Sequence, residues 1–303
     1  MSQQPNKVSV RVPGSTSNCG AGFDTLGMAV DLHNDVTLMV GGDGPGAQPQ
    51  RESDGKAQAM ATEAAELFFQ YTKRTPLAFS YRIEGQVPST RGLGSSVTVR
   101  AGIIAGLDAL AGTGLSRHQL VALVTELEGH PDNAAASILG GFCVARSNPA
   151  DGAYVDCVRI EVPADLAFVT ASPLVEISTK ESRGRLPAKL PYFDAVRSIN
   201  SAAYLVAVFA SGKYDLLRGA VGDFMHEPYR LPHIPGAAAA ISAGVEAGAL
   251  TGWLSGSGSS VMCVCRREQA ETVMLAMRGS FAADKLACEG AVLRADNAGL
   301  RLI

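Results

Sequence analysis

One short segment, TRGLGSSVTVR at residues 90–100, constrains the fold most strongly because it joins two contrasting patterns. The residues before it, LAFSYRIEG, are typical of a β-strand, and the apolar run after it continues to Leu110 with helical spacing. Glycines at 92 and 94 permit a tight connection, so the sequence predicts a strand, a glycine loop and a helix. The exposed N–H groups at such a helix entrance favour an anion, although a glycine turn with a serine N-cap explains the loop equally well.

The strand pattern, with apolar residues at every second position, and the helical pattern, with apolar residues about every 3.6 positions, both recur along the chain. VSVRV at 8–12 alternates as a half-buried strand does, DVTLMV at 35–40 is a second strand, and GGDGPGAQPQRESDG at 41–55 is expected to be a surface loop. Apolar residues from Met60 to Tyr71 have helical spacing, and Ser116 is a plausible N-cap for another helix. The remaining expected elements are strands at 140–146, 153–162 and 166–172, a helix at 198–210, a strand–turn–strand at 249–265, a helix at 268–277 and a last strand at 291–295.

This arrangement predicts an α+β chain in two halves, residues 1–160 and residues 161–303. A formal net charge of −3 gives no electrostatic support for a nucleic-acid partner. The six cysteines include no C-x-x-C pair and are expected to be reduced thiols, with Cys263 and Cys265 packed in the core. Because no apolar run is long enough for a membrane span or resembles a signal peptide, we expect a cytoplasmic protein with no membrane partner.

Two familiar phosphate motifs are absent from the glycine loop. A Walker A sequence needs a lysine that is not present here, and a dinucleotide fingerprint needs a glycine where Val97 stands. SGSGSS at 255–260 matches neither pattern. An oxidoreductase that uses a nicotinamide cofactor therefore has little support.

Further polar, glycine-rich segments carry the residues of a candidate site. PGSTSNCGAGFDTLG at 13–27 contains Asn18 and Asp24, and ELEGHPDNAA at 126–135 holds two glutamates, a histidine, an aspartate and an asparagine within eight positions. Taken alone, each segment could be a solvated loop. Their presence in one chain, together with the two serine-glycine loops, indicates a binding site.

These segments resemble the motifs of the GHMP small-molecule kinases. PSTRGLGSSV at 88–97 is similar to the family's second motif, TSNCGAGFDTLG at 16–27 to its first, and LSGSGSS at 254–260 to its third. EGHPDN, STKESRGRLP and HEPYRLPHIPG narrow the resemblance to the homoserine kinase branch. The resemblance implies the two-domain GHMP kinase fold, with an N-terminal domain like domain 2 of ribosomal protein S5 and a ferredoxin-like C-terminal domain.

The resemblance also implies an activity, the ATP-dependent phosphorylation of the side-chain hydroxyl of L-homoserine to O-phospho-L-homoserine in threonine biosynthesis. ATP and Mg²⁺ are the implied cofactors, and a homodimer is one assembly that the resemblance allows. Two alternatives stay open. One is a sister kinase acting on L-threonine or another small alcohol, and the other is a non-catalytic relative that binds a metabolite.

The resemblance assigns roles to particular residues. The implied ATP and phosphate contacts are Pro88, Arg91, Gly92, Leu93, Gly94, Ser95, Ser96 and Thr98. The implied substrate contacts are Asn18, Asp24, His130, Arg183 and Arg230, the two arginines for a carboxylate.

Ser96 and a glutamate, Glu128 in preference to Glu126, are the implied magnesium ligands. Asp132 and Asn133 are the candidate catalytic residues. Asn133 stands where some family members carry an aspartate, and an amide cannot act as a general base. We therefore expect catalysis by electrostatic preorganisation, with Asp132 orienting the hydroxyl.

Overall fold

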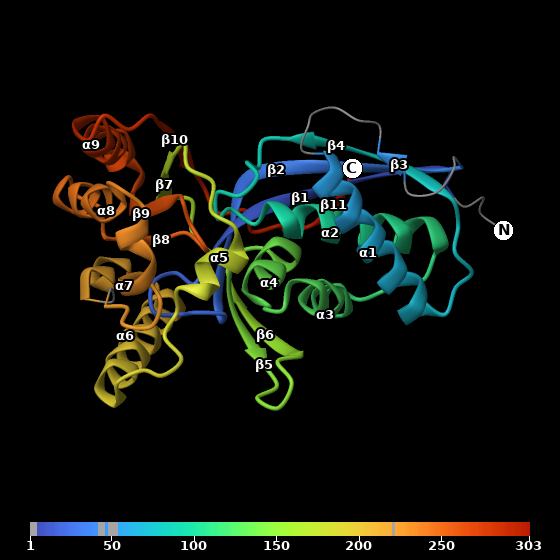
Figure 1. Cartoon of the computed structure of the whole chain (residues 1–303), viewed down its shortest axis with the longest axis horizontal. Coiled ribbons are helices and arrows are strands. Elements are labelled where there is room, and N and C mark those ends of the chain that lie inside the picture. The colour runs from blue at the N-terminus through green and yellow to red at the C-terminus, as the bar shows by residue number, and fades with distance from the viewer. Residues whose placement is uncertain (1–4, 42–45, 48–53, 220–221) are drawn as a thin grey trace.

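The computed structural model describes residues 5–41, 46–47, 54–219 and 222–303, so most of the loop expected at 41–55 lies outside the described residues. In these residues the strands form two sheets, which lie side by side along the long axis of the molecule (Figure 1). The fold is thus α+β in two halves, as the sequence predicts.

The first sheet has seven strands in the described part of the chain, in the order β11-β1-β2-β4-β3, with β5 also pairing with β2 and β6 with β5. Its strands are β1 (Lys7–Ser17), β2 (Leu26–Val40), β3 (Gly46–Ala47), β4 (Phe79–Gly85), β5 (Phe142–Ser147), β6 (Tyr154–Ile160) and β11 (Arg301–Leu302). Helices of the first half are α1 (Asp54–Thr72), α2 (Ser95–Ala111), α3 (Arg117–Glu128) and α4 (Asp132–Leu139). Helices α2 and α4 pack on β1 and β2, which places the entrance of each helix near the end of β1.

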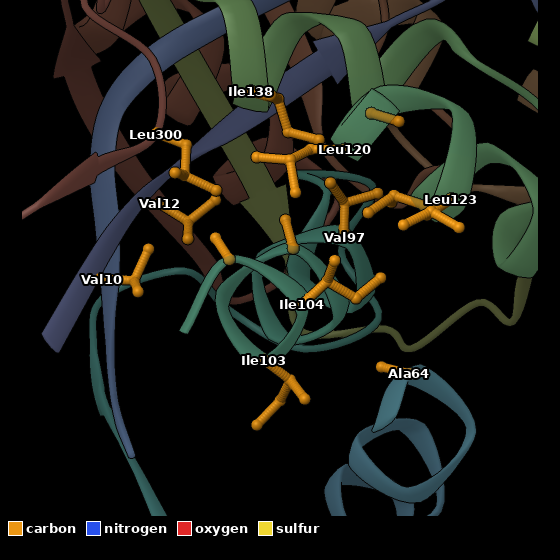
Figure 2. Packing of buried hydrophobic residues seen from close by; sticks show 14 of the residues in the cluster. Val10, Val12, Ala64, Val97, Ile103, Ile104, Leu120, Leu123, Ile138 and Leu300 are labelled. Atoms are coloured by element: carbon orange, nitrogen blue, oxygen red, sulfur yellow. The ribbon is translucent and has the colours of Figure 1, made fainter. Parts of the chain in front are cut away.

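The core of the first half lies between this sheet and α2 (Figure 2). Val10 and Val12 of β1 are fully buried, as the alternation of the sequence predicts, and they face the same cluster as Val97 and Ile104 of α2. Ser116 caps α3 as expected, since its side chain accepts from the N–H of Gln119 in a capping box.

The second sheet has the strand order β10-β7-β9-β8, and every neighbouring pair is antiparallel. Its strands are β7 (Leu166–Pro173), β8 (Thr251–Leu254), β9 (Val261–Arg266) and β10 (Cys288–Leu293). Numbered within this half, the order is 4-1-3-2, which is the ferredoxin-like arrangement that the family resemblance implies. Cys263 and Cys265 are completely buried on β9, as expected of core residues.

The helices of the second half are α5 (Thr179–Gly184), α6 (Tyr192–Ser211), α7 (Glu227–Arg230), α8 (Ala237–Glu246) and α9 (Ala270–Ala283). Three short 3-10 helices accompany them at Tyr214–Gly219, Leu231–His233 and Arg267–Gln269. Helices α8 and α9 pack against each other and on the second sheet. Across the part of the chain that the structure describes, no helix is both long and apolar enough to cross a membrane.

The chain does not end in the second half, because β11 returns to pair with β1 of the first sheet. Leu300 belongs to the core of the first half, and Ala295 forms a bridge with Val30. The strand expected at 291–295 is present as β10 but is not the last strand, contrary to the sequence prediction. A strand of two residues carries too short a pattern to be recognised in a sequence.

A separate apolar cluster joins the two halves. It combines Leu26 and Phe142 of the first half with Phe168, Phe209 and Trp253 of the second. The rings of Phe142 and Phe209 stack with centroids 4.1 Å apart, which is favourable beyond the area they bury. The halves therefore share a core and are expected to unfold together.

Phe209→Ala tests this shared core. Removing a fully buried phenyl ring should lower the free energy of unfolding by about 3–5 kcal/mol and keep a single transition. The measurement is urea unfolding followed by circular dichroism, and Leu275→Ala, at a side chain that is 63% exposed, is the control. Two separate transitions in the wild type, or equal effects of the two variants, would contradict a shared core.

Candidate active site

The predicted glycine loop connects β4 to α2 and leaves the start of that helix open. Gly94 is the N-cap of α2, adopts the left-handed conformation with φ 71°, and provides no side-chain cap. Gly92 is also left-handed, with φ 72°. Because no side chain caps the helix, its first N–H groups and the positive end of its dipole are free for an anion. The serine N-cap interpretation is thereby excluded, since the N-cap is a glycine.

Both glycines are required by close packing against other loops. A Cβ at Gly92 would overlap the carbonyl oxygen of Ser255, and a Cβ at Gly94 would lie 2.5 Å from Ser15 Oγ. Ser255 Oγ donates to the carbonyl of Gly92 at 2.6 Å, and the N–H of Ser260 donates to the carbonyl of Arg91 at 3.2 Å. The SGSGSS segment at 255–260 therefore supports the glycine loop that contains Gly92 and Gly94.

Several of the residues implied for phosphate contact are engaged within the protein. Leu93 is buried in the apolar cluster between the halves. Thr98 is buried and donates to the carbonyl of Ser95 at 2.7 Å, and Arg91 donates to the carbonyl of Pro173. Pro88 and Ser95 are half-buried at the two ends of the loop. The open groups of the loop are thus mainly its backbone N–H groups.

The hydroxyl of Ser96 lies next to a single glutamate. Ser96 Oγ donates to Glu128 Oε2 at 3.0 Å, and the Glu128 side chain is only 9% exposed. Glu126 is exposed. The geometry therefore favours Glu128 over Glu126 as the partner of Ser96, and the two hard oxygen atoms suit a magnesium ion.

The start of α4 contributes a histidine–aspartate pair. His130 Nδ1 lies 2.8 Å from Asp132 Oδ1, and the same oxygen accepts from the N–H of Asn133 at 2.7 Å. Burial lowers the pKa of His130, but the hydrogen bond and charge of Asp132 outweigh it and raise that pKa above its ordinary value. In return, His130 lowers the pKa of the fully buried Asp132 despite the opposing effect of burial. The pairing with Asp132 therefore favours the charged imidazolium form of His130.

Asn133 is fixed at both ends of its amide. Its Oδ1 accepts from Ser15 Oγ at 2.9 Å, and its Nδ2 donates to Ser17 Oγ at 2.9 Å. Sequence analysis missed Ser15 and Ser17, although their spacing of two on β1 places both side chains on one face of that strand. This arrangement orients the amide of Asn133.

The loop between β1 and β2 carries the remaining polar groups. Asn18 and Asp24 both have left-handed backbone conformations, with φ 67° and 53°. Asn18 Oδ1 accepts from the N–H of Asp24, and its Nδ2 donates to the carbonyl of Gly256. Asp24 forms a bidentate ion pair with Arg183 of α5, with N–O distances of 3.0 and 2.5 Å.

Arg230 of α7 is a buried cation, and no carboxylate of the described residues forms an ion pair with it. It is only 2% exposed, donates to the carbonyl of Gly256 at 3.3 Å, and its Nε has no hydrogen-bond partner. Burial and the nearby charge of Arg183 lower the pKa of Arg230 to about 10. Both guanidinium groups lie over the ring of Phe23, at 5.0 and 5.2 Å from its centroid. Sequence analysis assigned Phe23 no role.

These groups come together from distant parts of the chain. One side-chain atom from each of Asp24, His130 and Asp132, a carboxylate oxygen or a ring nitrogen, lies within 4.8 Å of the other two. The site therefore combines an open helix entrance suited to phosphate, a hydroxyl–carboxylate pair suited to a hard cation, and a cluster of charges suited to a small polar molecule. Every substrate residue implied by the resemblance lies in or beside this cluster.

Comparisons with known proteins identify the family of this chain. The family model described as GHMP kinases N terminal domain matches residues 59–141, and that described as GHMP kinases C terminal matches residues 205–283. A curated relative from Moorella thermoacetica, named homoserine kinase, is 41% identical over 92% of this chain and 94% of its own length.

The chain belongs to the GHMP kinase family. A relative of the same name from Synechococcus is 34% identical to this GHMP kinase, covering 96% of this chain and 94% of its own. The crystal structure of homoserine kinase from Cytophaga hutchinsonii matches with a TM-score of 0.88 at 27% identity, over 100% of this chain and 99% of that one. Membership in a kinase family makes ATP the phosphoryl donor and a small molecule the acceptor.

The His130–Asp132 pair of this kinase makes a pH-dependent contribution to stability. Because the pKa of His130 is raised in the folded state, this contribution is fully present below its unfolded value, about 6.5, and is lost as the pH rises through the raised value. Because the pKa of Asp132 is lowered in the folded state, the stability contribution is also lost at acid pH, as the pH falls below about 3.9 and through the lowered pKa.

Asp132→Asn should therefore lower the pKa of His130, since burial is then opposed only by the weaker effect of the Asp24 charge. It should also cost more unfolding free energy at pH 6 than at pH 9. NMR titration of the histidine ring protons and urea unfolding at both pH values measure these effects. Asp156→Asn, beside the exposed His118, is the matched control. An unchanged pKa of His130 in Asp132→Asn would show that the two groups are not coupled.

Proposed function

We propose that this GHMP kinase transfers the γ-phosphoryl group of ATP to the side-chain hydroxyl of L-homoserine, giving O-phospho-L-homoserine. The observation that carries the proposal is the charge arrangement of Asp24, Arg183 and Arg230. Arg183 is paired with Asp24, whereas the buried Arg230 forms no ion pair with a carboxylate of the described residues.

A zwitterionic amino acid complements this arrangement. Its ammonium group can replace Arg183 as the partner of Asp24, while its carboxylate can lie between Arg183 and Arg230. The exchange replaces one ion pair by several and supplies the anion that the buried Arg230 lacks. It also relieves the repulsion between the two guanidinium groups, which lowers the pKa of Arg230 in the free chain.

The choice of L-homoserine among amino acids rests on the relatives. Both curated relatives described above are named homoserine kinase and match nearly the whole chain. In this assignment the amino-acid end contacts Asn18, Asp24 and the arginines, and His130 lies on the side of the site that faces Asn133. We place the reaction in threonine biosynthesis and in the cytoplasm, where the six free cysteines would remain reduced.

The nucleotide is proposed to bind with its phosphates over Gly92–Ser96, at the uncapped entrance of α2. Ser96 and Glu128 would hold Mg²⁺, and their two oxygen atoms fit such an ion because both are hard donors on one side of the loop. When bound, Mg²⁺ neutralises negative charge on the phosphates. The loop N–H groups and the helix dipole add stabilisation from the protein itself.

Catalysis is proposed to rely on positioning and charge rather than on a general base. The hydroxyl oxygen forms the new bond to the γ-phosphorus as the bond to ADP breaks, and the hydroxyl proton passes to an oxygen of the transferred phosphoryl group. Asn133 is fixed by Ser15 and Ser17 and cannot accept a proton usefully. Asp132 is engaged with His130 and with the N–H of Asn133, so it acts as a positioning residue for both. When protonated, His130 would add positive charge to the site.

A coupled assay of ADP release with Mg-ATP tests the function directly. L-homoserine, L-threonine, L-serine, mevalonate and galactose are the acceptors to compare. Highest kcat/KM with L-homoserine supports the proposal. A higher value for L-threonine or another alcohol would identify the sister kinase, and release of ADP with none of them would favour a non-catalytic binding protein.

The two arginines provide a test of substrate identity. Arg183→Ala and Arg230→Ala should each lower kcat/KM for L-homoserine. The loss corresponds to about 2–5 kcal/mol of activation free energy, because a desolvated carboxylate loses a charge-assisted partner. Arg230→Lys should remain impaired, since an ammonium lacks the planar fork of guanidinium. Arg82→Ala, at an exposed arginine on β4, is the control and should leave kcat/KM unchanged.

L-homoserine amide, which lacks the carboxylate charge, completes a double-mutant cycle with these variants. It should be a poor substrate for the wild type and should lose much less than L-homoserine on either substitution. If both substrates lost equal activity in Arg183→Ala and Arg230→Ala, the arginines would not bind the carboxylate.

The chain is further proposed to form a homodimer through the outer face of α6. Tyr192, Val196 and Ile199 follow one another on one face of this helix and are 77%, 44% and 65% exposed. Figure 1 shows α6 at the lower edge of the second half. A twofold pairing of this face would cover large apolar side chains that are otherwise in water.

Ile199→Glu should break such a dimer, because two carboxylates would be buried near the twofold axis. Size-exclusion chromatography with light scattering should give twice the 31.4 kDa chain mass for the wild type and for Leu275→Glu, an exposed position on α9. It should give the single-chain mass for Ile199→Glu. A monomeric wild type, or a dimeric Ile199→Glu, would refute this interface.

A further inference from the structure

Arg100 joins the proposed magnesium ligand to a second carboxylate. It lies one helical turn after Ser96 on α2. Its Nη1 donates to Glu128 Oε1 at 2.5 Å, and its Nη2 donates to Glu63 Oε2 at 2.8 Å. The Arg100 side chain is only 14% exposed, whereas that of Glu63 is 53% exposed. Arg100 thus forms a nearly buried ion pair with Glu128 and an outer pair with Glu63.

Both oxygen atoms of Glu128 are occupied in this arrangement. Oε1 accepts from Arg100 and Oε2 accepts from Ser96. A guanidinium group is charged at any ordinary pH, so Arg100 meets Glu128 and Glu63 as a cation. The negative charge of Glu128 is therefore balanced by a fixed cation before any ligand binds.

A fixed cation changes which metal species can bind. A divalent ion that approaches Ser96 and Glu128 alone meets a carboxylate already paired with a cation, and Arg100 repels the ion at short range, while the second carboxylate, Glu63, lies on the exposed side of Arg100. A divalent ion that arrives with a nucleotide brings the negative charges of the phosphates, which outweigh the same cation. Arg100 therefore penalises the free ion much more than the metal–nucleotide complex.

We infer that Arg100 is a positioning residue that holds Glu128 in an internal ion pair, so that a divalent cation binds this kinase only together with the nucleotide. This inference rests on the proposed assignment of Ser96 and Glu128 as the magnesium ligands. It is independent of the identity of the phosphoryl acceptor. The device makes metal binding and nucleotide binding strongly cooperative.

The test measures metal binding rather than turnover. Mn²⁺ is titrated into the protein, without homoserine, and the bound ion is followed by electron paramagnetic resonance in the absence and in the presence of β,γ-methylene-ATP. The quantity compared is the ratio of the two Mn²⁺ dissociation constants. In Arg100→Met this ratio should fall about tenfold, chiefly because the nucleotide-free protein binds Mn²⁺ more tightly.

Three further variants separate charge from structure. Arg100→Gln repeats the loss of charge with a polar side chain and should behave as Arg100→Met, which keeps the test valid if one variant folds poorly. Arg100→Lys retains the charge and should keep the wild-type ratio. Glu128→Gln added to Arg100→Met should abolish the gain in Mn²⁺ affinity, because the freed carboxylate is then absent.

Contrary results identify which idea fails. An unchanged ratio in both Arg100→Met and Arg100→Gln, or an equal fall in Arg100→Lys, would overturn the role of the cation. A gain that persists with Glu128→Gln would place the ion elsewhere and overturn the inference as well. Failure of L-homoserine in the ADP assay, with the Mn²⁺ results as expected, would overturn only the proposed acceptor.

Discussion

The close approach of three glycine-containing loops at the junction of the two sheets is the constraint on which the site depends. Gly92 lies against the carbonyl of Ser255, where no Cβ can be accommodated. The next residue of that loop, Gly256, uses its carbonyl to accept from Asn18 and from Arg230. One backbone segment therefore supports the phosphate loop on one side and the amino-acid cluster on the other, so the two parts of the site share a rigid support.

The charges of the site are arranged for a ligand rather than for stability. A buried arginine without an ionic partner destabilises a folded protein, and Arg230 is such a residue. Phe23 and the carbonyl of Gly256 compensate only in part. In contrast, Glu128 is in contact with a cation, Arg100, which also pairs with Glu63. Among the described residues, the proposed amino-acid subsite thus contains a cation without an ion-pair partner, whereas the proposed metal ligand already has one.

Local patterns in the sequence predicted local features well. Ser116 was recognised as an N-cap because capping depends on the few residues around it. Helix α8 was missed, since AAAAISAGVE offers no contrast between polar and apolar positions. The ion pair of Asp24 with Arg183 joins residues 159 positions apart, and no periodicity encodes such a contact. The family motifs named both residues, but their pairing in the free chain is visible only in the structure.

The return of β11 to β1 has a consequence for how the chain is made. Val10 pairs with Leu302 and Arg11 with Arg301, so the first sheet gains this neighbour only after residue 302 has left the ribosome. The residues of the second half are synthesised between these two partners. During translation one edge of β1 therefore stays without its partner β11 while the ferredoxin-like half is synthesised. The first sheet, whose strand β1 is synthesised first, is therefore the last to gain all of its strands.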